Sequence, residues 1–397
     1  MNRDFDLVLF GATGFTGRLC AEYLAQRQEL DATRWAIAGR QRSKLEELRV
    51  HLTSIDSRLS KLAIIEASSD SLLNLRAMAA RTRVIATTVG PYRIHGLALV
   101  EACVAEGTHV CDITGEPEFV AETLSRFGDL ARQKNISVVS TCGFDSVPHD
   151  FGAWLTVRAL PPSDEPTTVH GFVSAKGTFS GGTWQSAVGA MARIKQSAAA
   201  VKRSRVEPRD GRRVAAAKEG FRYDKRMEAW AVPLPTIDPA VVLRSASELT
   251  EYGQSFRYGH FAKVKSLATV VASGFFLGGV AALAQVPASR SWLLKQRASG
   301  DGPSAEERAR SRFTVHFFGE RGPHNSEVIV SGKDPGYDET AKMLGEAALC
   351  LACDDKLRPT ARGVQTPVVA LGDAYLNRLR RAGLKFDIKA GLDPWAP

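Results

Sequence analysis

The chain has 397 residues, of which 44% are hydrophobic, so it is long enough for two domains and can fill a sizeable core. Its 52 Lys and Arg against 43 Asp and Glu give a formal net charge of +9, and its six cysteines show no disulfide-like framework. These features exclude a secreted domain held together by disulfides. Asp4 and Asp6 interrupt the apolar N-terminal stretch, so we expect no signal peptide and a cytoplasmic protein.

A glycine-rich heptapeptide, GATGFTG, occupies Gly11 to Gly17. Residues 5–10 before it form a short apolar, β-rich run, and apolar residues recur at helical spacing after Phe15, so the glycines join a predicted strand to a predicted helix. The spacing G-x-x-G-x-x-G is looser than G-x-G-x-x-G. The segment therefore fits a phosphate cradle, and it also fits a plain strand–turn–helix.

Each glycine has its own expected role in such a cradle. Gly11 allows the sharp turn, Gly14 lets the backbone approach a pyrophosphate, and Gly17 lets helix and strand pack closely. The N–H groups at the start of the helix then favour an anion. The expected cofactor contacts in this loop are Gly11, Thr13, Gly14, Phe15, Thr16 and Gly17.

The next predicted strand, within RWAIAGR, ends at Gly39-Arg40 with no acidic residue at its tip. NAD-binding folds usually place an Asp or Glu there against the ribose, whereas a guanidinium suits a 2′-phosphate. The expected contacts are Arg40, Ser43 and Lys44, unless these are solvated residues that open a helix. The tip predicts NADP(H) as the cofactor.

Strands and helices continue to alternate as far as residue 143. The predicted strands are 62–68, 83–90, 108–115 and 136–143, and the predicted helices are 43–53, 70–80, 95–106 and 117–134. This α/β alternation predicts a Rossmann-type doubly wound parallel sheet over residues 1–150, the NADP-binding domain. Ligands bind beyond the carboxyl ends of such strands, so we add Thr88, Val89, Gly90 and Pro91 to the cofactor contacts.

Tyr92 and the segment CGFDSVPHD supply the candidate catalytic residues. Tyr92 follows Gly90-Pro91 at a strand tip, where it donates a proton or hydrogen bond, or packs its ring under the nicotinamide. Asp145 and Ser146 are expected beside the nicotinamide, unless they only cap a helix at 150–159. No Tyr has Lys four positions later, which disfavours Tyr-x-x-x-Lys carbonyl reduction.

Four further residues in these segments have weaker expected roles. His149 and Asp150 follow Asp145 in the same segment and are expected behind it, away from the nicotinamide. Asp112 and Glu116 either bind substrate or, in the favoured interpretation, stabilise their own loop. Cys350 and Cys353 lie in an apolar helical pattern with no second pair nearby, so they are interpreted as core and no metal site is expected.

Residues 151–336 have a different pattern, typical of an α+β substrate domain. They contain a predicted strand at 168–177, a helix at 183–201, the segment EAWAVPLP at 228–235 and a hairpin at 312–332. A last helix at 337–353 and the tail at 366–397 form a C-terminal part, 337–397, that we expect to pack near the cofactor domain.

Five motifs carry a resemblance to a known family. GATGFTG, AGR, TTVGPY, DITGE and CGFDSVPHD, in this order, resemble the saccharopine dehydrogenase-like oxidoreductases, and more closely the trans-acting enoyl reductases of actinobacterial lipid synthesis. The likeness is strong over residues 5–150 and thinner at 180–183 and 366–376. It implies an NADPH-dependent reductase of an α,β-unsaturated acyl chain built by a polyketide synthase without its own reductase domain.

Two other functions remain open. One is a saccharopine-type amino-acid dehydrogenase, which needs convergent arginines for the substrate carboxylates. The other is a non-catalytic protein that senses NADP or docks on a membrane.

Two segments of the second domain point to partners. Residues 266–287 carry no charge, and they form a buried helix or pocket wall, insert into one leaflet, or span a bilayer. Residues 193–226 contain 12 Lys or Arg against four Asp or Glu, a charge that suits anionic lipid on the inner face of a membrane, an acidic acyl carrier protein, or a solvated loop. The basic region lacks interleaved stacking aromatics, so nucleic acid is not expected.

Overall fold

The computed structural model describes residues 3–27, 29, 34–177, 181–208, 210–296 and 302–392, and these form two compact units. Unit 1 consists of the described residues of Met1–Phe144 and Gly336–Ala382. Unit 2 consists of those of Asp145–Pro335 and Gly383–Pro397. We expected domain boundaries at residues 150 and 336. Unit 2 instead begins at Asp145, and it also includes the last strand of the chain.

Unit 1 contains the predicted doubly wound parallel sheet. Its seven parallel strands lie in the order β14-β6-β5-β4-β1-β2-β3. The strands are β1 (Phe5–Phe10), β2 (Trp35–Gly39), β3 (Ala63–Glu66), β4 (Thr82–Thr87), β5 (His109–Asp112), β6 (Ser137–Val139) and β14 (Gly363–Gln365). The sequence did not predict β14, because three residues are too few to show a strand pattern.

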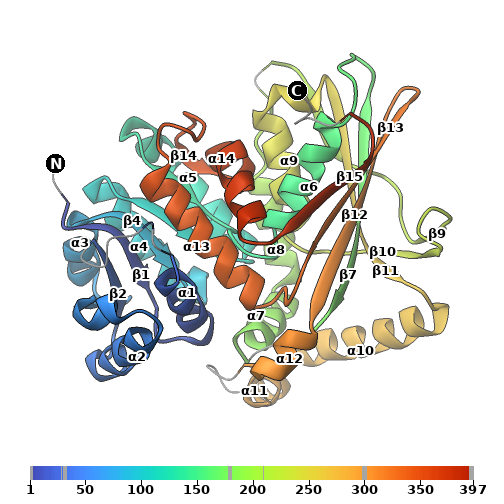
Figure 1. Cartoon of the computed structure of the whole chain (residues 1–397). Helices are drawn as coiled ribbons and strands as arrows, with labels where there is room; N and C mark the ends of the chain where they lie inside the picture. Colours follow the sequence, from blue (N-terminus) through green and yellow to red (C-terminus); the bar gives the residue numbers. More distant parts are fainter. Residues whose placement is uncertain are drawn as a thin grey trace. The chain divides into compact units, whose positions relative to one another are not determined.

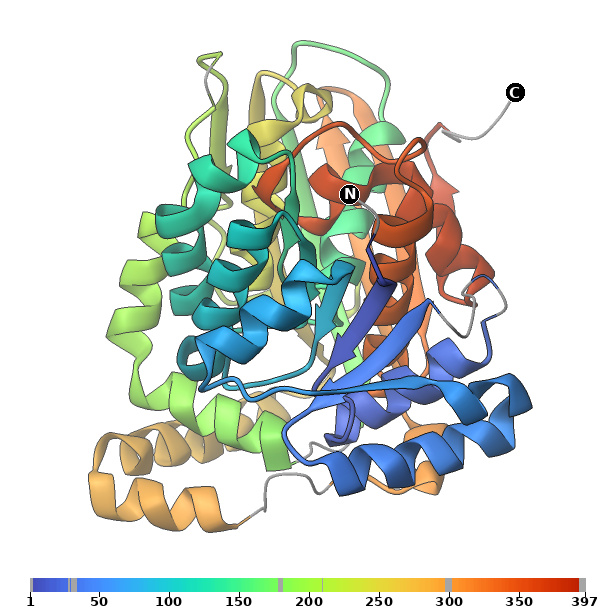
Figure 2. The same ribbon diagram turned by 90° about the vertical axis from the view of Figure 1, so that its left-hand side faces the viewer.

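Helices cover both faces of this sheet (Figures 1 and 2). One face carries α1 (Phe15–Ala25), α2 (Arg42–Ile55) and α13 (Asp338–Cys353), and the other carries α3 (Leu72–Ala80), α4 (Tyr92–Glu106) and α5 (Pro117–Gln133). A short 3-10 helix, Ser57–Lys61, follows α2, and α14 (Pro367–Arg381) packs on α13 and β6. Right-handed crossovers that run in opposite directions from the sheet centre produce this arrangement.

The strand order reverses between β1 and β4, which are neighbours in the sheet although they are far apart in the chain. The backbone N–H of Thr88 donates to the carbonyl of Phe10 at 3.0 Å, so the loops that follow the two strands begin side by side. This reversal point is where ligands of doubly wound sheets bind.

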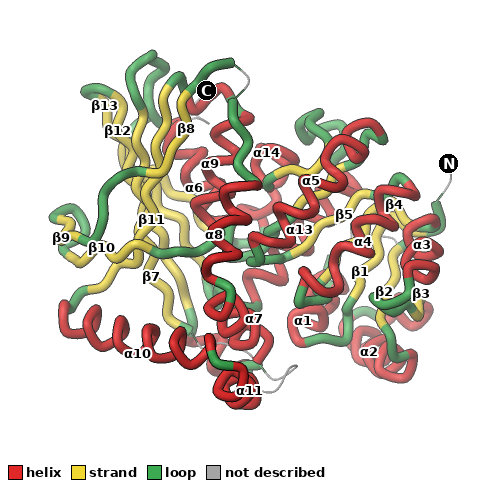
Figure 3. Tube along the Cα trace, turned by 180° about the vertical axis from the view of Figure 1, so that it is seen from behind, coloured by secondary structure: helices red, strands yellow, loops and turns green. Residues whose placement is uncertain are grey.

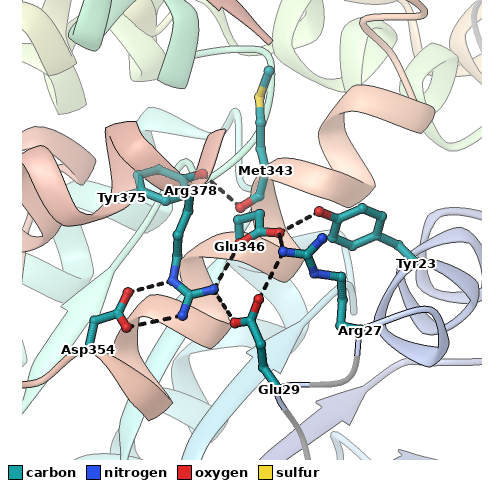
Figure 4. Close-up of polar contacts among 8 residues, drawn as sticks. All are labelled: Tyr23, Arg27, Glu29, Met343, Glu346, Asp354, Tyr375 and Arg378. Atoms are coloured by element: carbon teal, nitrogen blue, oxygen red, sulfur yellow. Dashed lines mark hydrogen bonds and ion pairs between the residues drawn. The ribbon is translucent and has the colours of Figure 1, made fainter. Parts of the chain in front are cut away.

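A cluster of charged side chains joins α1 to α13 and α14 (Figure 4). The carboxylate of Glu346, whose side chain is fully buried, accepts from the hydroxyl of Tyr23 and pairs with Arg27 at 3.1 Å and Arg378 at 3.1 Å. Arg378 also pairs with Glu29 at 2.6 Å and with Asp354. The cluster fixes the C-terminal helices on the first helix of unit 1.

Glu346→Ala should therefore lower the free energy of unfolding by about 3–5 kcal/mol, because it leaves buried guanidinium charge without its carboxylate. Glu46→Ala is the matched control, since Glu46 pairs with Arg42 and Arg49 at the surface of α2 and its loss should cost less than about 1 kcal/mol. Denaturant unfolding followed by circular dichroism measures both; equal losses would contradict the structural role of the cluster.

Unit 2 is built on a mixed sheet of eight strands, in the order β15-β13-β12-β7-β11-β10-β9 with β8 paired to β11. The strands are β7 (Thr167–Lys176), β8 (Arg213–Ala216), β9 (Arg222–Asp224), β10 (Ala229–Pro233), β11 (Ser255–Val264), β12 (Arg312–Arg321), β13 (His324–Gly332) and β15 (Lys385–Ala390). The long strands β7, β12 and β13 lie side by side in Figure 1. The predicted hairpin at 312–332 is present. Of the tail at 366–397, the residues up to Ala382 belong to unit 1, and the strand β15 joins the sheet of unit 2.

The helices of unit 2 are α6 (Val147–Arg158), α7 (Gly181–Ala192), α8 (Ile194–Arg203), α9 (Asp238–Glu248), α10 (Leu267–Gln285), α11 (Pro287–Lys295) and α12 (Ala305–Arg310), with a 3-10 turn at Thr250–Tyr252. Helix α6 packs against β7, β12 and β13. Gly152 permits this approach, since a Cβ there would lie 2.1 Å from Cε2 of Phe317. The single helix predicted at 183–201 is two helices, because the backbone leaves the helical conformation at Arg193.

Helix α10 is long and apolar enough to cross a membrane by length and composition. The buried-helix interpretation of residues 266–287 is wrong for most of this segment, because only Val280 and Ala284 of α10 are buried.

Candidate active site and cofactor cradle

Close packing requires glycine at two positions of the loop between β1 and α1. Gly11 has φ +88°, and a Cβ there would lie 2.7 Å from Cγ2 of Val89. A Cβ on Gly17 would lie 2.1 Å from the carbonyl oxygen of Gly11. Gly11 thus makes the turn, and Gly17 lets α1 approach the end of β1.

Gly14 is different, because nothing in the protein crowds it. Its φ of −73° suits any residue, and the nearest atom to a Cβ there would be the Gly11 carbonyl oxygen at 3.4 Å. Within the described residues no side chain caps α1, and its first turn contains no acidic residue. No first-turn carboxylate thus offsets the positive end of the helix, which favours an anion there and fits a cofactor pyrophosphate.

The loop after β4 supports the glycine loop. The hydroxyl of Thr88 donates to the carbonyl of Gly11 at 3.0 Å. Thr88 and Val89 are half-buried, whereas Gly90 and Pro91 are exposed. The expected cofactor contacts from β1 and β4 thus lie in two loops held to each other by a hydrogen bond.

The end of β2 lies beside the same loop. A Cβ on Gly39 would be 3.8 Å from Oγ1 of Thr13. Arg40 follows directly and is exposed, as are Ser43 and Lys44 in the first turn of α2. Arg40 and Lys44 thus place two exposed cations at the end of β2, the position from which NADP-binding folds of this kind contact a 2′-phosphate.

The C-terminal part of the chain also reaches the glycine loop. The ring of Phe15 meets the ring of Tyr337 edge to face, with centroids 5.1 Å apart, and Tyr337 is buried. Thr16 beside Phe15 is half-buried. Sequence reasoning missed Tyr337, because no local motif marks it and more than 300 residues separate it from Phe15.

Tyr92 lies at the N-terminus of α4 with its hydroxyl among backbone groups. The hydroxyl donates to the carbonyl of Thr87 at 3.0 Å and accepts from the N–H of Ile113 at 3.4 Å. Burial, followed by the charge of Asp112, raises the pKa of Tyr92 well above its usual value. This geometry links the ends of β4 and β5 and favours a positioning role over proton donation.

Asp112 and Glu116 stabilise loops, as the favoured interpretation expected. Glu116 accepts from the N–H groups of Tyr92 at 2.8 Å and Arg93 at 3.1 Å, so a carboxylate already caps α4. Asp112 accepts from the N–H of Thr114 and the hydroxyl of Ser140. Burial nevertheless raises the pKa of Asp112 to about 6.

Asp145 is the first residue of unit 2 and directly follows Phe144, whose N–H donates to Thr340 at 3.1 Å in unit 1. Its side chain keeps solvent-accessible surface, yet desolvation by surrounding protein, followed by the charge of Asp238, raises the pKa of Asp145 to about 6. Ser146 precedes α6, and its buried hydroxyl donates to the carbonyl of Asp145 rather than capping a helix N–H.

Unit 2 also contains a group of four side chains that we call the histidine cluster: His149, Asp238, Tyr258 and His260. Nδ1 of His149 lies 2.8 Å from Oδ1 of Asp238, and Nε2 of His260 lies 3.5 Å from its other oxygen. Tyr258 hydrogen-bonds Nδ1 of His260 at 3.2 Å. Burial alone would raise the pKa of Asp238, but His149 and His260 hold it below its usual value, while burial lowers the pKa of His260 to about 4.

Sequence reasoning singled out only His149 from this cluster. Asp238 begins α9, whereas Tyr258 and His260 lie on β11, and no short-range spacing connects the three segments. Among the described residues no group of His, Cys, Asp and Glu has the arrangement of a metal site.

Comparison with known proteins agrees with this geometry. The profile of the saccharopine dehydrogenase NADP binding domain matches residues 7–139, which include the glycine loop, Arg40 and the loop after β4. A Mycobacterium tuberculosis protein provisionally named trans-acting enoyl reductase is 34% identical over 96% of this chain and 97% of its own length. A trans-acting enoyl reductase of Mycobacterium bovis is 30% identical, again over 96% of this chain and 97% of its own length.

The chain belongs to the trans-acting enoyl reductase family. As a member of this family it is an oxidoreductase, and its unit 1 binds NADP(H). Yeast saccharopine dehydrogenase (L-Glu forming) from Saccharomyces cerevisiae has the same fold, with a TM-score of 0.56 over 97% of this chain and 99% of its own, at 12% identity. A lipid droplet localized protein of Caenorhabditis elegans is 26% identical to this chain, over 98% of this chain and 99% of its own length.

Proposed function

We propose that this protein is an NADPH-dependent enoyl reductase acting in the cytoplasm on a long-chain or polyketide-derived acyl substrate, presented by an acyl carrier protein or by a membrane. The names of its relatives support the reaction and the lipid class. The observation that carries the proposal is the position of Asp145, an exposed carboxyl group one residue after the end of the cofactor-binding unit, and a pKa raised to about 6 by desolvation supports its role.

Reduction of a conjugated enoyl group needs a hydride at the β-carbon and a proton at the α-carbon. The bound cofactor supplies the hydride. The start of α1 beside Gly14 holds the pyrophosphate, and Arg40 with Ser43 and Lys44 holds the 2′-phosphate. Tyr92 keeps the loop after β4 in place through the backbone of Thr87.

Asp145 supplies the proton in this proposal. With its pKa raised to about 6, the carboxyl group of Asp145 is protonated in roughly one molecule in ten at neutral pH, far more than an ordinary aspartate, and its exposed surface lets it regain a proton from water. Ser146 fixes the backbone of Asp145 through its hydroxyl. The buried negative charge of Asp238 helps to keep Asp145 protonated.

The test is an NADPH-oxidation assay with three substrate sets: long-chain enoyl thioesters of coenzyme A, the same chains on an acyl carrier protein, and saccharopine-type amino acids with their 2-oxo acid partners. We expect turnover with one or both enoyl sets and formation of the saturated chain by mass spectrometry. Turnover with the amino acids alone would refute the proposal. NADPH binding without turnover of any set would favour a non-catalytic NADP-binding protein.

A further inference from the structure

Helix α10 carries a large apolar surface that the described part of the protein leaves uncovered. Phe275 is 80% exposed and Phe276 is 63% exposed, and a Cβ on Gly274 or Gly278 would meet no atom within 4 Å. We call the exposed apolar side chains on α10 and the neighbouring α11 the α10 surface: Leu267, Val271, Phe275, Phe276, Leu277 and Trp292. Large apolar side chains gathered on an exposed helical segment mark an interaction site.

The helix is firmly anchored at one end. Val280 and Ala284 pack with Val188 of α7 and Leu293 of α11 in a small buried core. The indole N–H of Trp184 on α7 donates to the carbonyl of Leu293 at 2.7 Å. Figure 3 shows α10 running out from this helical group beside the sheet of unit 2. The exposed part of α10 is thus presented on a fixed support.

Charge identifies the partner that this surface fits. The chain contains no Asp or Glu from Tyr252 to Gly300, whereas Lys263 and Lys265 precede α10 and Arg290 and Lys295 follow its exposed part. Cations at both ends of an apolar segment match the phosphates that border the hydrocarbon of an anionic membrane. A second copy of the chain would instead bring these like charges together.

Sheet topology decides how the segment meets the membrane. The strand before α10, β11, and the strand that follows the helical segment, β12, both pair with β7 in one sheet. Because the strands before and after the segment belong to one sheet, both ends of the segment lie on the same side of any membrane. A single membrane span is therefore excluded. Helix α11 has nine residues, too few to cross back through a bilayer.

We propose that the α10 surface inserts into one leaflet of an anionic lipid membrane, with Phe275 and Phe276 in the acyl region and the flanking cations at the phosphates. Binding through this surface is independent of the reaction that the protein catalyses. It would attach unit 2 to the lipid phase in which long acyl chains dissolve.

The first experiment is co-sedimentation of the full chain with phosphatidylcholine vesicles that contain either no phosphatidylglycerol or about 30 mol% of this anionic lipid. We expect binding to the anionic vesicles and partial release in high salt. Phe275→Asp with Phe276→Asp should weaken the partition coefficient by about 100-fold, because each phenylalanine withdrawn from water contributes roughly tenfold or more. The matched control is Leu73→Asp on α3, which is as exposed as Phe275, at 80%, and should bind like the unmodified chain.

A second experiment separates charge from insertion. Lys265→Glu with Lys295→Glu should lower binding to anionic vesicles about tenfold or more, with little change in weak binding to neutral ones. Cys353 is the one exposed cysteine of the chain, so Ser273→Cys in a Cys353→Ser background accepts a single environment-sensitive dye. Its emission should shift to the blue on addition of anionic vesicles.

Three results would overturn the proposal. They are absence of binding to anionic vesicles, equal binding by the double aspartate variant and the unmodified chain, and an unchanged dye spectrum on bound protein. A dimer or a carrier-protein complex that requires Phe275 and Phe276 while vesicles do not bind would assign the surface to a protein partner instead. None of these measurements uses enoyl reduction, so failure of the α10 proposal is distinct from failure of the proposed function.

Discussion

Asp145→Asn should lower the turnover of enoyl substrates by about 100-fold or more and leave the Kd for NADPH within about twofold. Asparagine keeps the size of the side chain but cannot give up a proton to the α-carbon, and loss of a general acid has an effect of this scale. The phosphate contacts proposed in unit 1 do not involve position 145. Steady-state kinetics and NADPH fluorescence titration measure the two quantities.

Tyr92→Phe is the control for this variant. The Tyr92 hydroxyl is bound to the backbone of Thr87 and Ile113, so its loss should reduce stability by about 1 kcal/mol and turnover by only a few-fold. A large loss of turnover in Tyr92→Phe with full activity in Asp145→Asn would reverse the two roles.

The pH profile gives the same assignment an independent test. In our proposal Asp145 acts in its protonated form, and desolvation with the Asp238 charge raises its pKa to about 6. The turnover number should therefore be highest below about pH 6 and fall as pH rises above that value, approaching tenfold per pH unit. Asp238→Asn removes the repelling charge and should move this decline to lower pH. A profile that is flat from pH 5 to 8 would exclude Asp145 as the proton donor.

Arg40→Ala should weaken NADPH binding by about 30–100-fold, equivalent to about 2–3 kcal/mol, and change NADH binding by less than about threefold. The guanidinium at the end of β2 is exposed and contacts the 2′-phosphate in our proposal, and charged hydrogen bonds of this kind contribute about that much. Calorimetric titration with both cofactors gives the preference directly.

Arg42→Ala is the matched control, since Arg42 lies two residues further on and pairs with Glu46 on α2 at 3.5 Å. Its loss should leave the preference for NADPH intact. Equal affinity of the unmodified protein for NADPH and NADH would remove the role assigned to Arg40, and equal effects of both variants would show a general charge effect instead.

The sequence was most informative where structure is local. The strand before Gly11, the glycine spacing and Arg40 lie within about 35 residues of one another, and each acts through its own backbone or its own position at a strand end. The alternation of apolar strands and amphipathic helices likewise predicted the doubly wound sheet up to β6. These features depend on periodicity and turn chemistry, which adjacent residues carry.

Contacts between distant segments could not be predicted in this way. The histidine cluster joins His149 on α6 to Asp238 on α9 and His260 on β11, and these side chains meet only because α6 and α9 pack against the sheet of unit 2. The hydroxyl of Tyr92 had two open roles from sequence, and its partners at Thr87 and Ile113 exist only once β4 and β5 are paired.

Segment 266–287 shows the same division most clearly. Its composition by itself determined an uncharged helix of membrane-compatible length, because hydropathy is a property of the residues alone. Whether that helix is buried, spans or lies in a leaflet depends on what packs against it and where its ends return. The tertiary structure leaves Phe275 and Phe276 uncovered and pairs both flanking strands with β7, and burial and strand pairing are decided by the whole fold of unit 2.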